Sequence, residues 1–148
     1  MEKYFYNDLK KDLPQDQLHR LFKLVGWSDG SKTPEMINFY NVPFINSTLV
    51  ISVWCNDKMI GVIRVLSDKV FRSIIYDLIV DPEFQNQGIG SELIKRCIEH
   101  FPNSEWTVGT EKHIAGYYEK LGFTKIDKGN GVYLSIPCKL FINKNYEI

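Results

Sequence analysis

The sequence predicts an α/β fold in which a mixed, mostly antiparallel central sheet is flanked by helices. Most of its short, apolar, β-branched runs are joined by brief polar turns, as antiparallel strands are. Near the middle, a helical segment separates two strand segments, and this kind of crossover joins parallel strands. With 148 residues, 44% of them hydrophobic, the chain can bury one core. We therefore expect a single domain over residues 1–148, ending in a tail over residues 137–148.

The N-terminal part is expected to begin with a short strand at Tyr4–Asn7 and a helix after Pro14. Gly26 stands where the C-terminal cap of that helix belongs. The apolar residues of this helix recur at helical spacing and predict one buried stripe: Leu18, Leu21, Phe22 and Val25. Trp27 follows directly on the end of the helix.

A second helix is expected after the polar loop at residues 28–32. Thr33 suits the N-cap position and Pro34 the first helical position. We expect this helix to run through Tyr40 and to stop before Pro43.

Strands account for much of the rest of the chain. Leu49–Cys55 and Met59–Leu66 flank a short polar turn and predict a hairpin. A third strand follows the turn at residues 67–69 and ends at Val80. Residues 123–127 and 132–136 flank an Asn-Gly step and predict a final hairpin.

The segment after Val80 is the most informative for function. It carries two glycines, Gly88 and Gly90, and leads into a helix that is expected to begin near Gly90 and to end near Phe101. The first turn of a helix leaves backbone N–H groups without intrahelical acceptors, and glycine lets a ligand approach them closely. The sequence therefore predicts an anion site built from the main chain of the following residues: Asn86, Gln87, Gly88, Ile89, Gly90 and Ser91.

Two motifs resemble the signatures of the GNAT N-acetyltransferase superfamily. Residues 85–90 read Q-x-x-G-x-G after a Val-Asp-Pro strand exit, which is similar to the acetyl-coenzyme A signature of that family. Residues 115–123, Ala-Gly-Tyr-Tyr-Glu-Lys-Leu-Gly-Phe, resemble its second signature, and the strand Trp106–Thr110 separates the two motifs as the family order requires. Leu24–Trp27 and residues 71–82 more weakly resemble the plastid-type arylalkylamine branch.

The resemblance implies a GNAT fold, in which the two parallel middle strands splay apart around acetyl-coenzyme A, the implied co-substrate. In such a gap the main-chain groups of Leu78, Ile79 and Val80 lack a strand partner and are expected to bind the pantetheine arm. The turn at residues 86–91 is then expected to bind the pyrophosphate. The resemblance does not imply a bound metal ion.

The implied reaction is acetyl transfer to an amine, and it needs an acid and a route for proton removal. Tyr118 holds the place of the family's usual general acid, and a phenol of ordinary pKa is protonated at neutral pH. The base stays open between a water relay beside Tyr76, the less favoured Asp77 and His113, and direct binding of the rare neutral amine. Neither His19 nor His100 is expected to act chemically.

Trp27 and Tyr76 are the candidate acceptor-binding residues, and Tyr40 and Trp54 are further candidates for an aromatic wall. Three functions stay open. The first is an N-acetyltransferase for a small-molecule primary amine. The second is a protein lysine or N-terminal acetyltransferase, and the third is a catalytically silent acetyl-coenzyme A sensor.

Charge and cysteine content limit the classes of binding partner and of cellular compartment that the sequence predicts. Lys plus Arg and Asp plus Glu both number 18, so no net field favours nucleic acid or a membrane surface. The three cysteines, Cys55, Cys97 and Cys138, are widely spaced and suit buried thiols in a reducing compartment rather than metal ligands. We expect a cytoplasmic protein without a metal, and the apolar residues of the tail are consistent with a homodimer.

Overall fold

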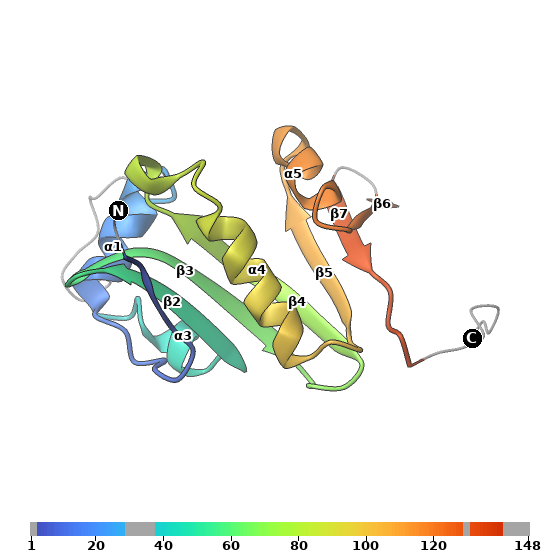
Figure 1. The fold of residues 1–148 in the computed structure, drawn as a ribbon, viewed down its shortest axis with the longest axis horizontal. Helices are drawn as coiled ribbons and strands as arrows, with labels where there is room; N and C mark the ends of the chain where they lie inside the picture. Colours follow the sequence, from blue (N-terminus) through green and yellow to red (C-terminus); the bar gives the residue numbers. More distant parts are fainter. Residues whose placement is uncertain (1–2, 29–37, 129–130, 141–148) are drawn as a thin grey trace.

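The computed structural model describes residues 3–28, 38–128 and 131–140. In this part of the chain, seven strands form one sheet in the order β1-β2-β3-β4-β5-β7-β6 (Figure 1). The strands are β1 (Phe5–Asn7), β2 (Leu49–Cys55), β3 (Lys58–Ser67), β4 (Arg72–Val80), β5 (Glu105–Thr110), β6 (Thr124–Lys128) and β7 (Gly131–Ile136). All neighbours are antiparallel except β4 and β5, which confirms the predicted parallel pair at the middle of a mixed sheet.

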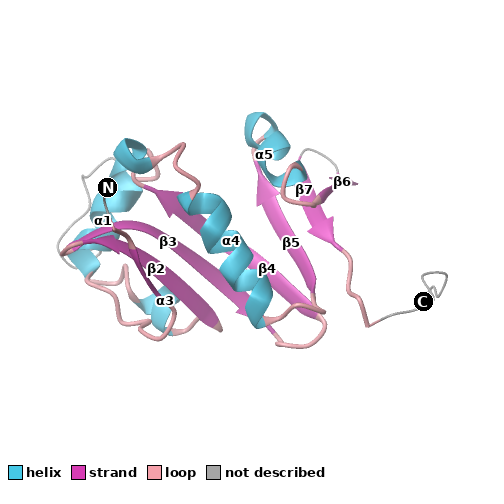
Figure 2. Cartoon of the chain, in the orientation of Figure 1, coloured by secondary structure: helices cyan, strands magenta, loops and turns pink. Residues whose placement is uncertain are grey.

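Helices cover both faces of the sheet (Figure 2). They are α1 (Gln15–Leu24), α3 (Val42–Ile45), α4 (Ile89–His100) and α5 (Ala115–Glu119), with short 3₁₀ turns η1 (Pro82–Phe84) and η2 (Lys112–Ile114). No helix among the described residues combines the length and the apolar composition of a membrane-spanning segment.

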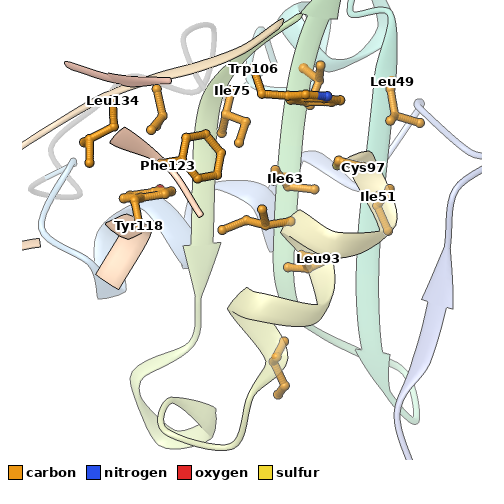
Figure 3. Packing of buried hydrophobic residues seen from close by; sticks show 14 of the residues in the cluster. Leu49, Ile51, Ile63, Ile75, Leu93, Cys97, Trp106, Tyr118, Phe123 and Leu134 are labelled. Atoms are coloured by element: carbon orange, nitrogen blue, oxygen red, sulfur yellow. The ribbon is translucent and has the colours of Figure 1, made fainter. Parts of the chain in front are cut away.

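Two hydrophobic clusters lie on opposite faces of the sheet. The larger cluster packs the sheet against α4 and α5, and Figure 3 shows Leu93 and Cys97 of α4 facing Ile51 and Ile63 of the strands. The smaller cluster joins α1 and α3 to the other face of β2, β3 and β4, through Leu18, Leu21, Phe44, Val50, Val62 and Ile79. β2 and β3 are therefore buried on both faces, which explains why their sequences are apolar almost throughout.

The two central strands separate along their length. Pairing of β4 with β5 runs only from Arg72, opposite Glu105, to Ile75, opposite Val108. On its other side β4 stays paired with β3 as far as Val80, opposite Gly61. Figure 1 shows β4 and β5 close together at their N-terminal ends and apart toward α5. The splay that the family resemblance implied is thus present from residue 76 onward.

A β-bulge lies where the splay begins. The register of β3 and β4 shifts between Arg64, which faces Asp77, and Val65, which faces Ile75. Tyr76 is therefore the extra residue of β4, with no opposite residue in β3. A bulge of this kind breaks the regular alternation of side chains between the two faces of the sheet, so the side of the sheet on which Asp77 lies has to be read from its contacts.

The region before β2 differs from the expectation. The predicted helix start at Thr33 and Pro34 lies outside the described residues, and Tyr40 lies in a turn rather than in a helix. Pro43 does not act as a stop, because it occupies one of the first two positions of the short helix α3. Proline is well tolerated there, since the first N–H groups of a helix have no intrahelical acceptor.

Candidate functional site

A cleft of about 1060 Å³ opens between the diverging parts of β4 and β5. Its walls come from β4, the turn before α4, the end of β5 and the segment leading into α5. Of the residues predicted from the sequence, the cleft is lined by Leu78, Ile79, Val80, Asn86, Gly88, Ile89, Gly90, Ser91, Tyr118, Trp27 and Tyr76. The fold thus brings candidate coenzyme-binding, catalytic and acceptor-binding residues to one place. Gln87 is the exception, because its side-chain oxygen accepts a hydrogen bond from the Tyr4 hydroxyl and it does not line the cleft.

The turn before α4 has the backbone geometry of an anion site. Asn86 and Gly88 both have left-handed conformations, with φ of +65° and +83°, and successive turns of this kind point N–H groups into one concavity. Gly88 is the N-cap of α4 and offers no side chain to cap it. The first helical bond runs from the Glu92 N–H to the Gly88 carbonyl at 3.0 Å. The N–H groups of residues 89–91 therefore have no acceptor within the helix.

Gln85 braces this turn from its N-terminal side. Its Nε2 donates a hydrogen bond to the Val80 carbonyl at 3.0 Å. One of the main-chain groups expected to be free for the pantetheine arm is therefore already engaged. Because β5 departs after Ile75, the other main-chain groups of residues 76–80 that point toward β5 have no strand partner there.

Tyr118 is buried at the inner end of the cleft. Its side chain is 5% exposed, and its ring meets Phe123 edge-on, with 5.6 Å between the ring centroids (Figure 3). Burial raises the pKa of the Tyr118 phenol well above its ordinary value, and the neighbouring Tyr117 raises it further. The hydroxyl is therefore a proton donor over the whole neutral range.

Tyr117 also lines the cleft, and its ring packs against the larger hydrophobic cluster. Its hydroxyl lies 3.3 Å from Ser91 Oγ, at the first turn of α4. A Cβ atom at Gly90 would lie only 2.7 Å from that hydroxyl. The Tyr117 hydroxyl thus occupies the space that a side chain at position 90 would need.

Asp77 points away from the cleft. Its carboxylate accepts a hydrogen bond from Arg64 Nε at 2.8 Å, and the Arg64 guanidinium stacks between the rings of Phe44 and Tyr76, at 5.7 and 5.3 Å. Leu78, by contrast, packs with the cluster on the α4 face. The Asp77 carboxylate is ion-paired with Arg64 and does not line the cleft, so the structure disfavours Asp77 as a base.

The remaining titratable groups of the cleft lie near its mouth. Glu111 and His113 both line it, and His113 Nδ1 lies 3.3 Å from Glu111 Oε2 on an exposed surface. The sequence flagged His113 but missed Glu111, because nothing in a lone glutamate after a strand points to a site. His19 is buried against Ser28, and His100 pairs with Asp8 on the surface, so neither reaches the cleft.

Aromatic residues form the acceptor side. Trp27 and Tyr76 are 55% and 52% exposed and line the cleft. Trp27 packs edge-on against Phe22, with 5.8 Å between the centroids. Phe22 also lines a second, apolar pocket of about 360 Å³, together with Phe39, Tyr40, Pro43, Phe44, Arg64 and Asp77. Trp54 does not line the cleft, because it belongs to the cluster on the α1 face.

Metal ligation has no candidate within the described ranges: no three His, Cys, Asp or Glu side chains gather there. Cys97 is buried in the core, and burial raises the pKa of its thiol far above the ordinary value. The polar groups that line the cleft include main-chain amides, tyrosine hydroxyls and the exposed Glu111 and His113 pair.

Comparison with known proteins agrees with this geometry. Residues 36–132, well over half of the chain, match the family described as acetyltransferase (GNAT) domain. An uncharacterized N-acetyltransferase ycf52 of Pyropia yezoensis is 30% identical over 134 residues, which are 86% of this chain and 74% of that protein. The chloroplastic GCN5-related N-acetyltransferase 2 of Arabidopsis thaliana is 31% identical over 75 residues, 49% of this chain and 29% of its own length.

Among solved structures, a GNAT family acetyltransferase, SP0256 from Streptococcus pneumoniae TIGR4, superposes with a TM-score of 0.68 and 26% identity. The match covers 82% of this chain and 88% of the bacterial one. Sequence relatives, fold and the splayed strands thus agree, and the chain belongs to the GNAT family of N-acetyltransferases.

Proposed function

We propose that the protein transfers the acetyl group of acetyl-coenzyme A to a primary amine of a small molecule, by direct attack on the thioester, with Tyr118 as general acid. One observation carries this proposal. The phosphate-type turn, the unpaired edge of β4 and the Tyr118 phenol all border a single cleft. A molecule with a diphosphate, an extended amide-bearing arm and a reactive sulfur has a matching partner for each of these groups in the cleft.

The residues that would hold the coenzyme fit its chemistry. Backbone N–H groups of residues 89–91, at the positive end of α4, suit a diphosphate. The edge of β4 opposite the splay suits the amides of the pantetheine arm, which pair with a free strand edge as an added strand would. Bound there, the coenzyme supplies the activated acyl group, and the chain supplies position and protons.

Tyr118 supplies the proton for the departing sulfur. Its phenol keeps its proton through the neutral range because burial disfavours the phenolate. A thiolate that develops charge in an apolar pocket is stabilised by such a donor. Tyr118 lines the cleft, so its hydroxyl is accessible to a ligand bound there.

The amine must lose a proton before it attacks. At neutral pH an amine with a pKa of about 10.4 is deprotonated in roughly one molecule in a few thousand, which costs on the order of 4–5 kcal/mol. No carboxylate of β4 faces the cleft, since Asp77 is paired with Arg64 on the other face. We propose that water beside Tyr76 carries this proton outward, toward the exposed Glu111 and His113 pair.

The choice of a small amine rests on the acceptor side of the cleft. Trp27 and Tyr76 present half-exposed rings, and the adjoining pocket behind Phe22 is apolar with one internal ion pair. Such walls suit a compact amine with an apolar body. An aromatic side chain in the acceptor fits these walls best, in agreement with the arylalkylamine resemblance. The cytoplasmic location and the homodimer remain predictions.

The proposal is tested by calorimetry with acetyl-coenzyme A, followed by thiol release with a panel of polyamines, arylalkylamines, aminoglycosides and lysine peptides. We expect coenzyme binding and release of free thiol with one class of small amine. Release with peptides alone would make the protein acetyltransferase the correct function. Binding without turnover on any acceptor would identify a sensor, and no binding of the coenzyme would refute all three functions.

The role of Tyr118 has its own test. Tyr118→Phe is expected to lower turnover by at least about tenfold with nearly unchanged coenzyme affinity, because only a proton donor is lost. Tyr6→Phe is the matched control, since Tyr6 lies on β1 beside Arg96 and outside the cleft. Equal turnover in the wild type and in Tyr118→Phe would remove this phenol from the mechanism.

A further inference from the structure

Tyr117 spans the mouth of the cleft. It belongs to α5, on the β5 side of the splay, and its hydroxyl reaches the first turn of α4, on the β4 side. There it lies 3.3 Å from Ser91 Oγ. It also lies 2.7 Å from the position that a Cβ of Gly90 would take. The hydroxyl is therefore next to residues 90 and 91, whose N–H groups have no acceptor within α4.

The absence of a side chain at Gly90 is what admits the hydroxyl. After the Tyr117 hydroxyl, the nearest atoms to a Cβ at this position are Tyr117 Cζ at 3.6 Å and Val80 Cγ2 at 3.7 Å. Only the oxygen comes closer than ordinary contact. The φ of Gly90 is not positive, in contrast to that of Gly88, so backbone conformation does not explain why glycine occupies position 90. A larger residue at position 90 would therefore clash with one specific atom, the Tyr117 hydroxyl oxygen.

The Tyr117 hydroxyl is placed to donate. Burial raises the pKa of Tyr117, and the hydrogen bond with Ser91 only partly offsets that effect. The phenol is consequently protonated at neutral pH. Beside the helix N-terminus it adds one side-chain donor to the main-chain N–H groups, and an anion is the ligand that several converging donors select.

Tyr117 and Tyr118 are neighbours in sequence but face different surroundings. Their rings are nearly perpendicular, at 77°, with centroids 5.3 Å apart. Tyr118 packs against Phe123 in the core, whereas Tyr117 approaches α4. The two hydroxyls of this short helix therefore have different neighbours in the same cleft.

We propose that Tyr117 binds the diphosphate of acetyl-coenzyme A at the N-terminus of α4 and closes the cleft over it, a role that rests on the proposed function. Tyr117 then determines coenzyme affinity, and Tyr118 determines turnover. The bridge to Ser91 keeps the hydroxyl in position before the coenzyme arrives. On binding, the hydroxyl donates to a phosphate oxygen and Ser91 remains its neighbour.

Tyr117→Phe tests this role with two acyl donors. For acetyl-coenzyme A we expect a rise of about tenfold in Kd and KM, with kcat within about twofold of the wild type, as for the loss of one hydrogen bond to a charged group. For S-acetylpantetheine, which keeps the thioester but lacks the diphosphate, we expect kcat/KM to be unchanged. Equal losses on both donors would mean a merely structural role and would overturn the proposal. Unchanged acetyl-coenzyme A affinity would overturn it as well, while leaving the proposed function intact.

Gly90→Ala gives an independent test. The added methyl must displace the Tyr117 hydroxyl, so we expect the coenzyme Kd to rise about as much as in Tyr117→Phe. The double variant should be no weaker than either single variant, because the methyl then meets no atom closer than about 3.6 Å and the hydroxyl is already lost. Additive losses would show that the methyl obstructs the coenzyme directly, which would overturn the steric link. Failure of the wild type to bind acetyl-coenzyme A would refute the proposed function itself.

Discussion

Glycines that look alike in the sequence serve different purposes at the residue level. At position 88 the backbone conformation favours glycine: φ is +83°, although there is open space where a Cβ would point. Gly61 has an ordinary φ, but a Cβ there would lie 2.7 Å from Val53 Cγ1 and 3.2 Å from the Ile79 carbonyl. Glycine is therefore needed at position 61 because β3 packs closely against its neighbouring strands. A motif of glycines does not distinguish these two causes.

Gly61→Ala and Gly116→Ala test this distinction. Gly61→Ala is expected to lower the free energy of unfolding by about 1–3 kcal/mol, because the methyl overpacks the centre of the sheet. Gly116→Ala is the matched control: it lies in α5 with open space around it, and there alanine is expected to be neutral or to stabilise by up to about 1 kcal/mol. Urea unfolding of both variants measures the difference. Equal destabilisation would contradict the steric reason for Gly61.

At the level of elements, β4 performs two tasks with one bulge. Before the bulge, β4 pairs with β5 and closes the sheet, and after it the edge of β4 that faced β5 has no strand partner. At the bulge, the ring of Tyr76 packs against the Arg64 guanidinium. The same guanidinium forms an ion pair with Asp77. The strand could be predicted from its apolar pattern. The bulge could not, because it depends on the register with β3.

Asp81 ties the end of β4 to α1. It is 2% exposed, and its carboxylate pairs with Arg20 at 2.6 Å and with Lys58 at 3.8 Å. The same side chain accepts a hydrogen bond from the Glu83 N–H and so starts the turn toward the anion site. The acceptor-side helix and the coenzyme-side turn are thus joined through one buried carboxylate.

Arg20→Met tests the strength of this link. We expect a loss of about 2–3 kcal/mol in the free energy of unfolding, since a buried carboxylate keeps only the more distant Lys58 as counter-charge. Arg72→Met is the control, because Arg72 is exposed and pairs with Glu105 at 3.5 Å, so its loss is expected to cost less than about 1 kcal/mol. Chemical denaturation of the two variants measures both values. Similar losses would mean that the Asp81 pair contributes no more than a surface pair.

For the whole molecule, stability depends on keeping the buried phenols neutral. Burial raises the pKa values of Tyr117 and Tyr118 above the ordinary value of 10.0. The unfolded chain then loses these protons at lower pH than the folded protein does. Unfolding at high pH releases protons, so stability is fully present below pH 10 and falls as the pH rises above it.

Comparison of the wild type with Tyr118→Phe isolates this effect. Between about pH 9 and about pH 11, the wild type is expected to lose roughly 1 kcal/mol more stability than the variant, because a single group contributes up to about 1.4 kcal/mol per pH unit. Urea unfolding at the two pH values measures the difference. Parallel losses in the two proteins would mean that Tyr118 ionises equally easily in the folded and unfolded states.

Local sequence chemistry was enough for much of this molecule. Short turns joined to β-branched runs fixed the hairpin of β2 and β3, and a period of 3.6 residues with a glycine start fixed α4. Pro43 was misread because proline both stops one helix and starts another, and the sequence does not say which. The contact of the Tyr117 hydroxyl with Ser91 could not be predicted, because it joins α5 to α4 across the cleft.

The sequence by itself determined the family and most of the strands and helices, because each depends on residues adjacent in the chain or on a local period. Tertiary structure decided which side chains meet across the splay. Asp77 forms an ion pair with Arg64, the Tyr117 hydroxyl lies next to Gly90, and the Val80 carbonyl accepts a hydrogen bond from Gln85. These contacts depend on strand register and on where β5 leaves β4, and both are set by packing between segments that are distant in the sequence.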